Sequence, residues 1–389
     1  MSKKLKFGII GCGNQGSAYA SFIEDGLVPS MELVAICDID SKQTDKLSQK
    51  YPAKEVFSDY KALIDSGLVE AIVTTVPHYL HPEIAMYAIS KGVHVLNEKP
   101  AGVYTKQVKE LNAFAAKHPD VTYAIMFNQR NNPLYQRIKQ IVDNGEIGAI
   151  RRTNWIITTW YRPDAYYGQS EWRATWGAEG GGVLVNQAPH QLDLIQWIAG
   201  VPKAVYAKAA YGYKRDIAVE DEVTAVLDYG NGATGVFITA THDILGTDRL
   251  EIFGDKGKII VEDSKKVTVK RLYKSEQEIN AGIKASGTRF EFPDGKQPNE
   301  IAEEEVFTTD SVWGAQHSGV LENFARHILH GEPLLAPGAD GIHGVRLANA
   351  IHLSSWLGKE VSLEDFDDDL YLSMLNEKIE EEGKYAPKP

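Results

Sequence analysis

Residues 4–40 read KLKFGIIGCGNQGSAYASFIEDGLVPSMELVAICDID, and this stretch decides the fold of the N-terminal part of the chain. It opens with an apolar run, Phe7 to Ile10, that predicts a short strand. The strand leads straight into a G-x-G-x-x-G turn at Gly11, Gly13 and Gly16. In such turns the first glycine permits a tight turn, the second lets the backbone approach a pyrophosphate, and the third lets helix and strand pack closely. The spacing therefore predicts a phosphate-binding loop.

A helix, a second strand and an acidic residue complete this unit. Ala18 to Ile23 fits a helix, whose free N–H groups would face the phosphates. Leu33 to Cys37 is a second apolar strand, and it ends at Asp38, about 20 residues beyond the helix start. Because a carboxylate there can hydrogen-bond both ribose hydroxyls and repels a 2′-phosphate, we expect NAD as the cofactor and NADP less favourably. A structural glycine turn without a ligand is the alternative.

Composition narrows the class of protein. The 389 residues, 43% of them apolar, suit two domains with buried cores. The formal charge of −12 and the lack of any Lys/Arg-rich run argue against a nucleic-acid partner. No signal segment and no membrane-length apolar run is evident, so we expect no membrane association and a cytoplasmic location. Cys12 and Cys37, the two cysteines, fit a reducing compartment.

Short strands continue to alternate with helices after Asp38, which predicts a parallel sheet covered on both faces. Ala71 to Val76 ends at Pro77-His78, and Val93 to Asn97 ends at Glu98-Lys99-Pro100. Ligands of such sheets bind outside the carboxyl ends of the strands, so we expect these ends to converge with the glycine turn on one crevice. The expected cofactor-binding residues are Gly11, Gly13, Asn14, Gln15, Gly16, Asp38, Thr75, Pro77, His78, His81, Glu98, Lys99 and Asn128.

The residue pattern changes near residue 129, where we place a domain boundary. From Arg151 onward β-branched and aromatic residues dominate, and Asn231-Gly232 and Gly254 to Gly257 are hairpin signals. Lys266 to Leu272 and Thr288 to Phe292 can extend the same sheet.

The predicted fold class is therefore α/β, with two domains. Residues 1–128 would form an NAD-binding Rossmann domain, and residues 129–389 an α+β domain with a large, mostly antiparallel open sheet. Apolar side chains on both faces of Thr153 to Trp160 and Thr234 to Ala240 predict a homodimer or homotetramer through that sheet.

Two residues could carry proton chemistry. Lys99 ends a crevice-facing strand, where a dry cleft and a positively charged nicotinamide would lower its pKa toward that of a general base. The alternative is a surface lysine paired to Glu98. His190 follows GGGVLVNQAP at the start of a helix, and Asp193, three residues on, could orient its imidazole. The alternative for His190 is a satisfied structural histidine.

Aromatic and cationic residues cluster in WYRPDAYYGQSEWRATW, residues 160–176, which predicts a wall for a sugar-like ligand. The expected substrate-binding residues in this segment are Tyr161, Arg162, Trp172, Arg173 and Trp176. A packed loop over the sheet is the alternative. We expect no metal site, because His78 and His81 have no companion Cys or carboxylate cluster.

Four motifs together resemble the glucose-fructose oxidoreductase and inositol dehydrogenase family, Gfo/Idh/MocA. They are GCGNQG, TTVPHYLHPEIAMYAISKGVHVLNEKP, GGGVLVNQAPHQLDLIQW and FGDKGKIIVE, and the resemblance runs from Lys6 to about Val361. It implies a Rossmann domain followed by an α/β domain with a large open sheet. It also implies NAD(P)-linked oxidation or reduction of a sugar, polyol or sugar derivative.

The resemblance assigns roles to single residues. Lys99 matches the family's catalytic lysine, His190 its catalytic histidine, and Glu98 a residue near the nicotinamide ribose. Many members carry Asp four residues before the histidine, where this chain has Asn186. An amide can hydrogen-bond a hydroxyl but cannot accept its proton, so base work would fall on Lys99. Lys99, Asn186 and His190 are the expected catalytic residues, and we expect all three to touch the substrate.

Three functions remain open at this point. The first is an NAD-dependent dehydrogenase of a sugar, inositol or related polyol, with Lys99 as base and His190 assisting. The second is a glycoside 3-dehydrogenase, or an enzyme that uses NAD transiently for glycoside cleavage or epimerisation. The third is a non-catalytic NAD-sensing regulator, against which the presence of both Lys99 and His190 argues.

Overall fold

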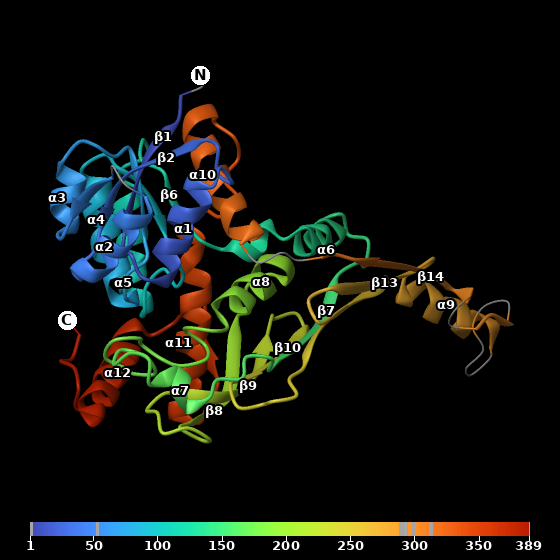
Figure 1. Ribbon diagram of the computed structural model, residues 1–389. Coiled ribbons are helices and arrows are strands. Elements are labelled where there is room, and N and C mark those ends of the chain that lie inside the picture. The colour runs from blue at the N-terminus through green and yellow to red at the C-terminus, as the bar shows by residue number, and fades with distance from the viewer. Residues whose placement is uncertain are drawn as a thin grey trace.

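The computed structural model describes residues 3–51, 54–287, 292, 295–297, 300–310 and 314–388. The chain forms two units, each organised on its own β-sheet, with the N-terminal unit lying against one end of the second (Figure 1). Among these residues, no helix is both long and apolar enough to cross a membrane.

The first sheet has six parallel strands in the order β3-β2-β1-β4-β5-β6. The order reverses between β1 and β4, which is where dinucleotides bind in doubly wound sheets. The predicted Rossmann fold is thereby confirmed. The strands are β1 (Leu5–Ile10), β2 (Met31–Cys37), β3 (Glu55–Phe57), β4 (Ala71–Thr74), β5 (His94–Asn97) and β6 (Tyr123–Ile125).

Helices cover both faces of this sheet. On one face lie α1 and α2, and on the other α3, α4 and α5. A further helix, α10 (Ala315–His330), arrives from the C-terminal half and packs beside α1, with Phe324 edge-to-face against Phe7 at 6.5 Å between ring centroids (Figure 1). The core of the N-terminal unit is therefore built from both ends of the chain. The bounds are α1 (Asn14–Glu24), α2 (Ser41–Lys50), α3 (Tyr60–Asp65), α4 (His81–Ser90) and α5 (Thr105–Ala115).

The second sheet has nine strands in the order β14-β13-β12-β11-β7-β10-β9-β8-β15. Among the described residues of this sheet, only β7 and β10 pair in parallel, so the prediction of a mostly antiparallel sheet is confirmed. Both hairpin signals lie between antiparallel strands, β9–β10 and β11–β12. The strands are β7 (Ile150–Ile157), β8 (Ala204–Tyr211), β9 (Glu220–Asp228), β10 (Thr234–Ala240), β11 (Asp248–Gly254), β12 (Gly257–Glu262), β13 (Lys266–Leu272), β14 (Ala302–Thr308) and β15 (Val361–Ser362).

One expected strand cannot be compared with the structure. Thr288 to Phe292 lies, apart from Phe292, outside the described residues. The strand that pairs with β13 is β14, and α9 (Glu276–Ser286) lies between them in the sequence. The sequence missed α9 because a single residue, Ile279, is buried in it, so it shows no apolar face.

Helices cover one face of the second sheet, and its opposite face is open. The helices that share its core are α6 (Pro133–Asp143), α8 (Pro189–Ala199), α11 (Gly341–Leu357) and α12 (Asp368–Glu382), and a short helix, α7 (Asp164–Tyr167), lies in the aromatic segment. Several large apolar residues remain exposed on the strands, namely Tyr206, Val226, Phe253 and Val306.

A buried arginine joins the segment that follows β6 to α8 and to Asp340. Arg130, in the 3₁₀ turn η2 (Asn128–Asn131), donates to both carboxylate oxygens of Asp193 at 2.7 and 2.9 Å, and to Asp340 at 2.6 Å. The side chains of Arg130 and Asp193 are 4% and 3% exposed. The expectation that Asp193 orients His190 is therefore wrong. Both carboxylate oxygens of Asp193 are instead bound by Arg130, a permanent cation.

Replacing Arg130 tests this junction. Arg130→Met would leave Asp193 buried without its cation, so we expect a loss of about 3–5 kcal/mol in the free energy of unfolding. Urea denaturation followed by circular dichroism measures it. Arg137→Met is the control, because Arg137 is 40% exposed and 3.6 Å from Glu305, and it should cost less than about 1 kcal/mol. Equal losses in both variants would contradict the assignment.

Candidate active site

The glycine turn leaves room for a phosphate above it. Gly11 has a φ of +97°, and a Cβ on it would lie 2.4 Å from the Thr75 carbonyl oxygen. A Cβ on Gly16 would lie 1.9 Å from the Gly11 carbonyl oxygen, so neither position accepts another residue. A Cβ on Gly13 would meet no described atom within 4 Å. Gly13 also begins α1 without a side-chain cap from the described residues, which leaves helix N–H groups for an anion.

Asp38 lies at the end of β2, beside this turn. Its carboxylate accepts from the backbone N–H of Cys12 at 2.7 Å and from that of Asp40 at 2.9 Å, which fixes its orientation. Asn14 is exposed at the start of α1, and the buried amide nitrogen of Gln15 has no hydrogen-bond partner among the described residues. The turn, the helix start and the fixed carboxylate together fit a dinucleotide.

The segment after β4 holds the neighbouring loops in place. The Thr75 hydroxyl donates to the Ile10 carbonyl at 3.1 Å and to that of Gly11 at 2.5 Å. The ring nitrogens of His81 contact two backbone carbonyls, of Pro100 at 2.7 Å and of Val76 at 2.9 Å. These contacts support the cofactor turn and the loop after β5, whereas the His81 ring itself is committed to protein.

His78, next to Pro77, faces the second domain. Its Nδ1 lies 3.0 Å from the Glu179 carbonyl oxygen, and its ring meets that of Trp172 edge-on at 5.7 Å. Burial lowers the pKa of His78 well below its ordinary value, so the ring is neutral. No group of three or more His, Cys, Asp or Glu in the described part of the chain is arranged to hold a metal.

Lys99 bridges the two units. Its ammonium donates to the backbone carbonyl of Asn186 at 2.9 Å, although these residues belong to different units. Burial lowers the pKa of Lys99, while Glu98 and Glu179 act in the opposite direction. Glu98 is itself buried, accepting from the Tyr19 hydroxyl and from the Lys99 backbone N–H. Lys99 is thus a half-buried residue whose ammonium contacts the other unit, rather than a surface lysine paired to Glu98.

Asn186 lies in the loop after the glycine run and His190 at the start of α8, and both are near Lys99. Burial first, and then the charge of Lys99, lower the pKa of His190 well below its ordinary value, so it is a neutral imidazole that can donate or accept. Its Nδ1 is buried and has no hydrogen-bond partner within the described chain. The side-chain amide of Asn186 donates to the carboxylate of Glu179.

Two further residues near Lys99, His317 and Glu179, were not predicted from the sequence as part of the site. His317, on α10, lies 3.4 Å from the Asn128 amide through its Nδ1, and its ring is 6.1 Å from that of Tyr19. Burial and the charge of Lys99 lower the pKa of His317 to about 4. No sequence signal marks it, since only tertiary packing brings α10 here. For Glu179 the one hint was its place directly before the glycine run 180–182.

The aromatic segment 160–176 divides into a cleft side and a core side. Arg173 stacks on Trp172 and on Tyr166, and donates to the Tyr166 hydroxyl at 2.7 Å. Trp172 contacts His78, so these groups line the approach to Lys99. Tyr161 and Arg162 lie further out, where Arg162 stacks on Tyr166 at 4.8 Å.

Trp176 belongs to the core side. Its indole N–H donates to the Ala218 carbonyl at 3.0 Å, and its ring packs edge-on against the stacked rings of His352 and Trp356. Helix α12 adds to this anchorage, because the carboxylate of Glu382 accepts from the backbone N–H groups of Trp176 and Gly177 at 3.1 Å each. We therefore leave Trp176 out of the ligand wall.

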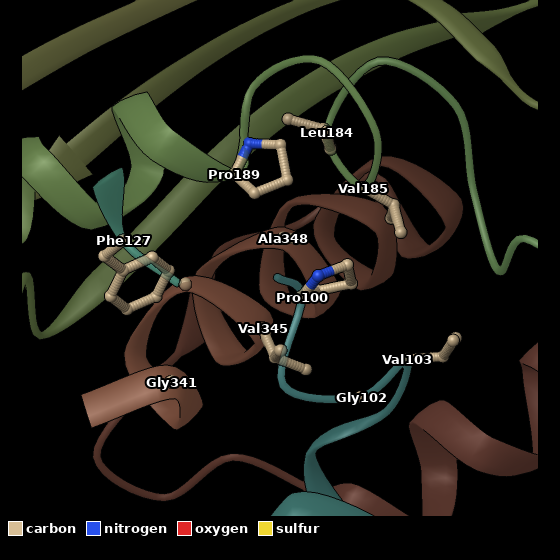
Figure 2. Close-up of a pocket in the computed structure, with 11 residues that line it drawn as sticks. Pro100, Gly102, Val103, Phe127, Leu184, Val185, Pro189, Gly341, Val345 and Ala348 are labelled. Atoms are coloured by element: carbon tan, nitrogen blue, oxygen red, sulfur yellow. The ribbon is translucent and has the colours of Figure 1, made fainter. Parts of the chain in front are cut away.

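An apolar cavity lies between the two units (Figure 2). Pro100, Phe127, Val185 and Pro189 line it, and each is the chain neighbour of a site residue, respectively Lys99, Asn128, Asn186 and His190. Helix α11 lines another side of it. Residues that adjoin the site in the chain thus enclose an apolar cavity.

Two family profiles match this chain. The profile described as "Oxidoreductase family, NAD-binding Rossmann fold" matches residues 5–126, and "GFO/IDH/MocA C-terminal domain" matches residues 135–260. The chain belongs to the Gfo/Idh/MocA family. It is an NAD-dependent oxidoreductase, and the resemblance seen in the motifs is confirmed.

Relatives match along almost the whole chain. "Uncharacterized oxidoreductase YrbE" of Bacillus subtilis (strain 168) is 27% identical over 94% of this chain and 98% of its own. "Myo-inositol 2-dehydrogenase" of Thermotoga maritima is 24% identical over 93% and 99%. Among solved structures, the WlbA dehydrogenase from Bordetella pertussis, in complex with NADH and UDP-GlcNAcA, is 23% identical, covers 92% of this chain and 99% of its own, and has a TM-score of 0.74.

Asp38 offers a test of cofactor selection. Asp38→Ala removes the ribose acceptor and the charge that repels a 2′-phosphate, so we expect the NADH/NADPH affinity ratio to fall at least about tenfold. Titration of cofactor fluorescence gives both dissociation constants. Asp40→Ala is the matched control, since Asp40 is exposed two residues further on and caps α2. A ratio unchanged in Asp38→Ala would refute the assignment.

Proposed function

We propose that this protein oxidises a hydroxyl group of a sugar, inositol or related polyol, with NAD as hydride acceptor. The observation that carries the proposal is the contact of the Lys99 ammonium with the Asn186 carbonyl. It brings an amine from the cofactor-binding unit to the loop that carries Asn186 and His190. Bound NAD supplies the nicotinamide C4 that accepts the hydride from the carbinol carbon.

The residues then have separate tasks. Lys99, whose pKa is lowered by burial, takes the hydroxyl proton as the C–H bond gives its electron pair to the cofactor. His190, neutral at physiological pH, donates to the same oxygen and stabilises the developing charge. Asn186 holds the hydroxyl in place, and the Trp172–Arg173 wall supports the rest of the ring. The products are a carbonyl compound, NADH and a protonated Lys99.

A bulkier glycoside is the second candidate substrate. The Trp172–Arg173–Tyr166 stack continues outward to Arg162, which suits a ligand longer than one sugar ring. The similarity to a dehydrogenase solved with the nucleotide sugar UDP-GlcNAcA supports the same idea. Oxidation at C3 of a glycoside, or transient NAD use during cleavage or epimerisation, would follow. A purely NAD-sensing regulator would have no use for a buried amine and imidazole in one cleft.

Assembly through the second sheet is part of the proposal. Its open face exposes Tyr206 and Val226, which are 50% and 45% exposed, on neighbouring strands. A second copy would cover them, and we expect light scattering to give the mass of a homodimer or homotetramer. Val226→Glu should shift the protein toward monomer. A monomeric wild-type protein would contradict this part of the proposal.

A substrate panel tests the reaction. Free sugars, polyols, inositols and glycosides are offered with NAD or NADP while NADH absorbance is followed. Net NADH with a free sugar or polyol supports the first candidate, and product from a glycoside without net NADH supports the second. No product from any compound, despite tight NADH binding, would favour a regulator.

Lys99→Ala tests the base on any substrate that the panel identifies. We expect turnover to fall about 10²- to 10⁴-fold while the dissociation constant of NADH stays nearly unchanged. In the wild-type protein, turnover should rise with pH as Lys99 loses its proton, with a midpoint below the ordinary lysine value of about 10.4. Lys46→Ala, at an exposed position on α2, is the control. Comparable turnover in Lys99→Ala would rule the role out.

A further inference from the structure

Glu179 is a carboxylate buried at the meeting point of the two units. It is 2% exposed and lies directly before the glycine run. One carboxylate oxygen accepts from the side-chain amide of Asn186, and the other accepts from the backbone N–H of Ala174 at 2.5 Å. Its backbone carbonyl lies 3.0 Å from Nδ1 of His78. Glu179 thus contacts the loop of Asn186, the ligand wall and the cofactor segment.

The hydrogen bond from Asn186 to Glu179 determines which end of the Asn186 amide is left for a ligand. An asparagine amide has an N–H₂ end that only donates and an oxygen that only accepts. Because the carboxylate of Glu179 holds the N–H₂ end, the oxygen is the end that remains for a ligand. A substrate hydroxyl whose proton is shared with Lys99 would find an acceptor there, as it would at a carboxylate in this position.

When ionised, Glu179 also carries a negative charge that acts on Lys99. Burial raises the pKa of Glu179 to about 7, with the charge of Glu220 adding to the rise, while the hydrogen bonds from Asn186 and Ala174 and the charge of Arg173 oppose it. It is therefore mostly ionised above about pH 8.

The ionised carboxylate acts on Lys99, whose surroundings contain charges of both signs. The negative charge of Glu179 raises the pKa of Lys99, as that of Glu98 does, and Arg173 lowers it. The neutral imidazoles of His78, His190 and His317 also lie within the influence of the Lys99 charge. A carboxylate near a base that becomes an ammonium during the reaction stabilises the protonated product state.

We propose that Glu179 is a positioning residue of the site. It fixes the Asn186 amide with its oxygen toward the substrate and supplies the negative charge that stabilises the Lys99 ammonium once the hydroxyl proton has been taken. This inference rests on the proposed oxidation of a hydroxyl, and it adds no atoms or electrons to that reaction.

Exchanging the carboxylate and the amide gives the sharpest test. In Glu179→Gln the new amide oxygen can satisfy Ala174, so its N–H₂ faces Asn186, which must turn and present a donor to the cleft. We expect kcat/KM to fall about 10- to 100-fold, less than the loss of a direct transition-state contact. In Glu179→Gln/Asn186→Asp the carboxylate faces the cleft again, and at least about tenfold of the loss should return. Glu171→Gln, an exposed glutamate of the same segment, is the control.

A readout that needs no substrate separates this inference from the proposed function. Competitive acetylation over a range of pH, followed by mass spectrometry of the peptide that contains Lys99, reports the pKa of that amine. Glu179→Gln should lower this pKa, because a negative charge is removed, and the double variant should raise it again. A lowered pKa would support the role of Glu179 even if every panel compound were inert, in which case the proposed function alone would fail.

The opposite outcomes overturn the inference. An unchanged Lys99 pKa together with unchanged kcat/KM in Glu179→Gln would show that the carboxylate has no such role. Thermal unfolding checks both variants. If the single and double variants are equally unfolded, or if the double variant recovers neither activity nor the Lys99 pKa, Glu179 serves only to hold its loop.

Discussion

The site depends on one hydrogen bond, from the Lys99 ammonium to the Asn186 carbonyl, because it joins the two units where their functional groups meet. Lys99 is delivered by a strand of the parallel sheet, and Asn186 by a glycine loop of the other unit. The carboxylate of Glu220 stabilises that loop by accepting from the backbone N–H groups of Gly182 at 2.9 Å and Leu184 at 3.0 Å. The buried Arg130–Asp193 ion pair holds α8, the helix that carries His190, to the segment after β6. These contacts fix the positions of the Lys99 amine and the His190 imidazole.

Burial gives these groups their chemistry. Burial favours the neutral form of an amine and of an imidazole, and it lowers the pKa of Lys99 and of His190; these are the states that the proposed roles of base and donor require. Pro100 and Pro189, the chain neighbours of these two residues, line an apolar cavity (Figure 2). Glu98 and Glu179 limit the shift, since each stabilises the charged form of Lys99.

The sequence predicted what is encoded locally. The glycine turn, the acid at Asp38 and the strand ending at Lys99 each follow from a few consecutive residues, so the Rossmann fold and the cofactor crevice could be placed. It could not supply partners that tertiary packing selects. Asp193 has its carboxylate on Arg130 rather than on His190, Trp176 points into the core, and His317 arrives on a helix from the far end of the chain. For Glu179 the sequence gives only its place before the glycine run, because its hydrogen bond to Asn186, seven residues away, is made by the folded loop.

The proposed reaction requires Lys99 to be a base beside the nicotinamide ring. Competitive acetylation tests this by giving the pKa of Lys99 in the free protein and with NAD or NADH bound. We expect a value below about 10.4 in the free protein, a further decrease with NAD, whose ring is positively charged, and a smaller change with neutral-ringed NADH. An ordinary lysine pKa that responds equally to both cofactors would contradict it.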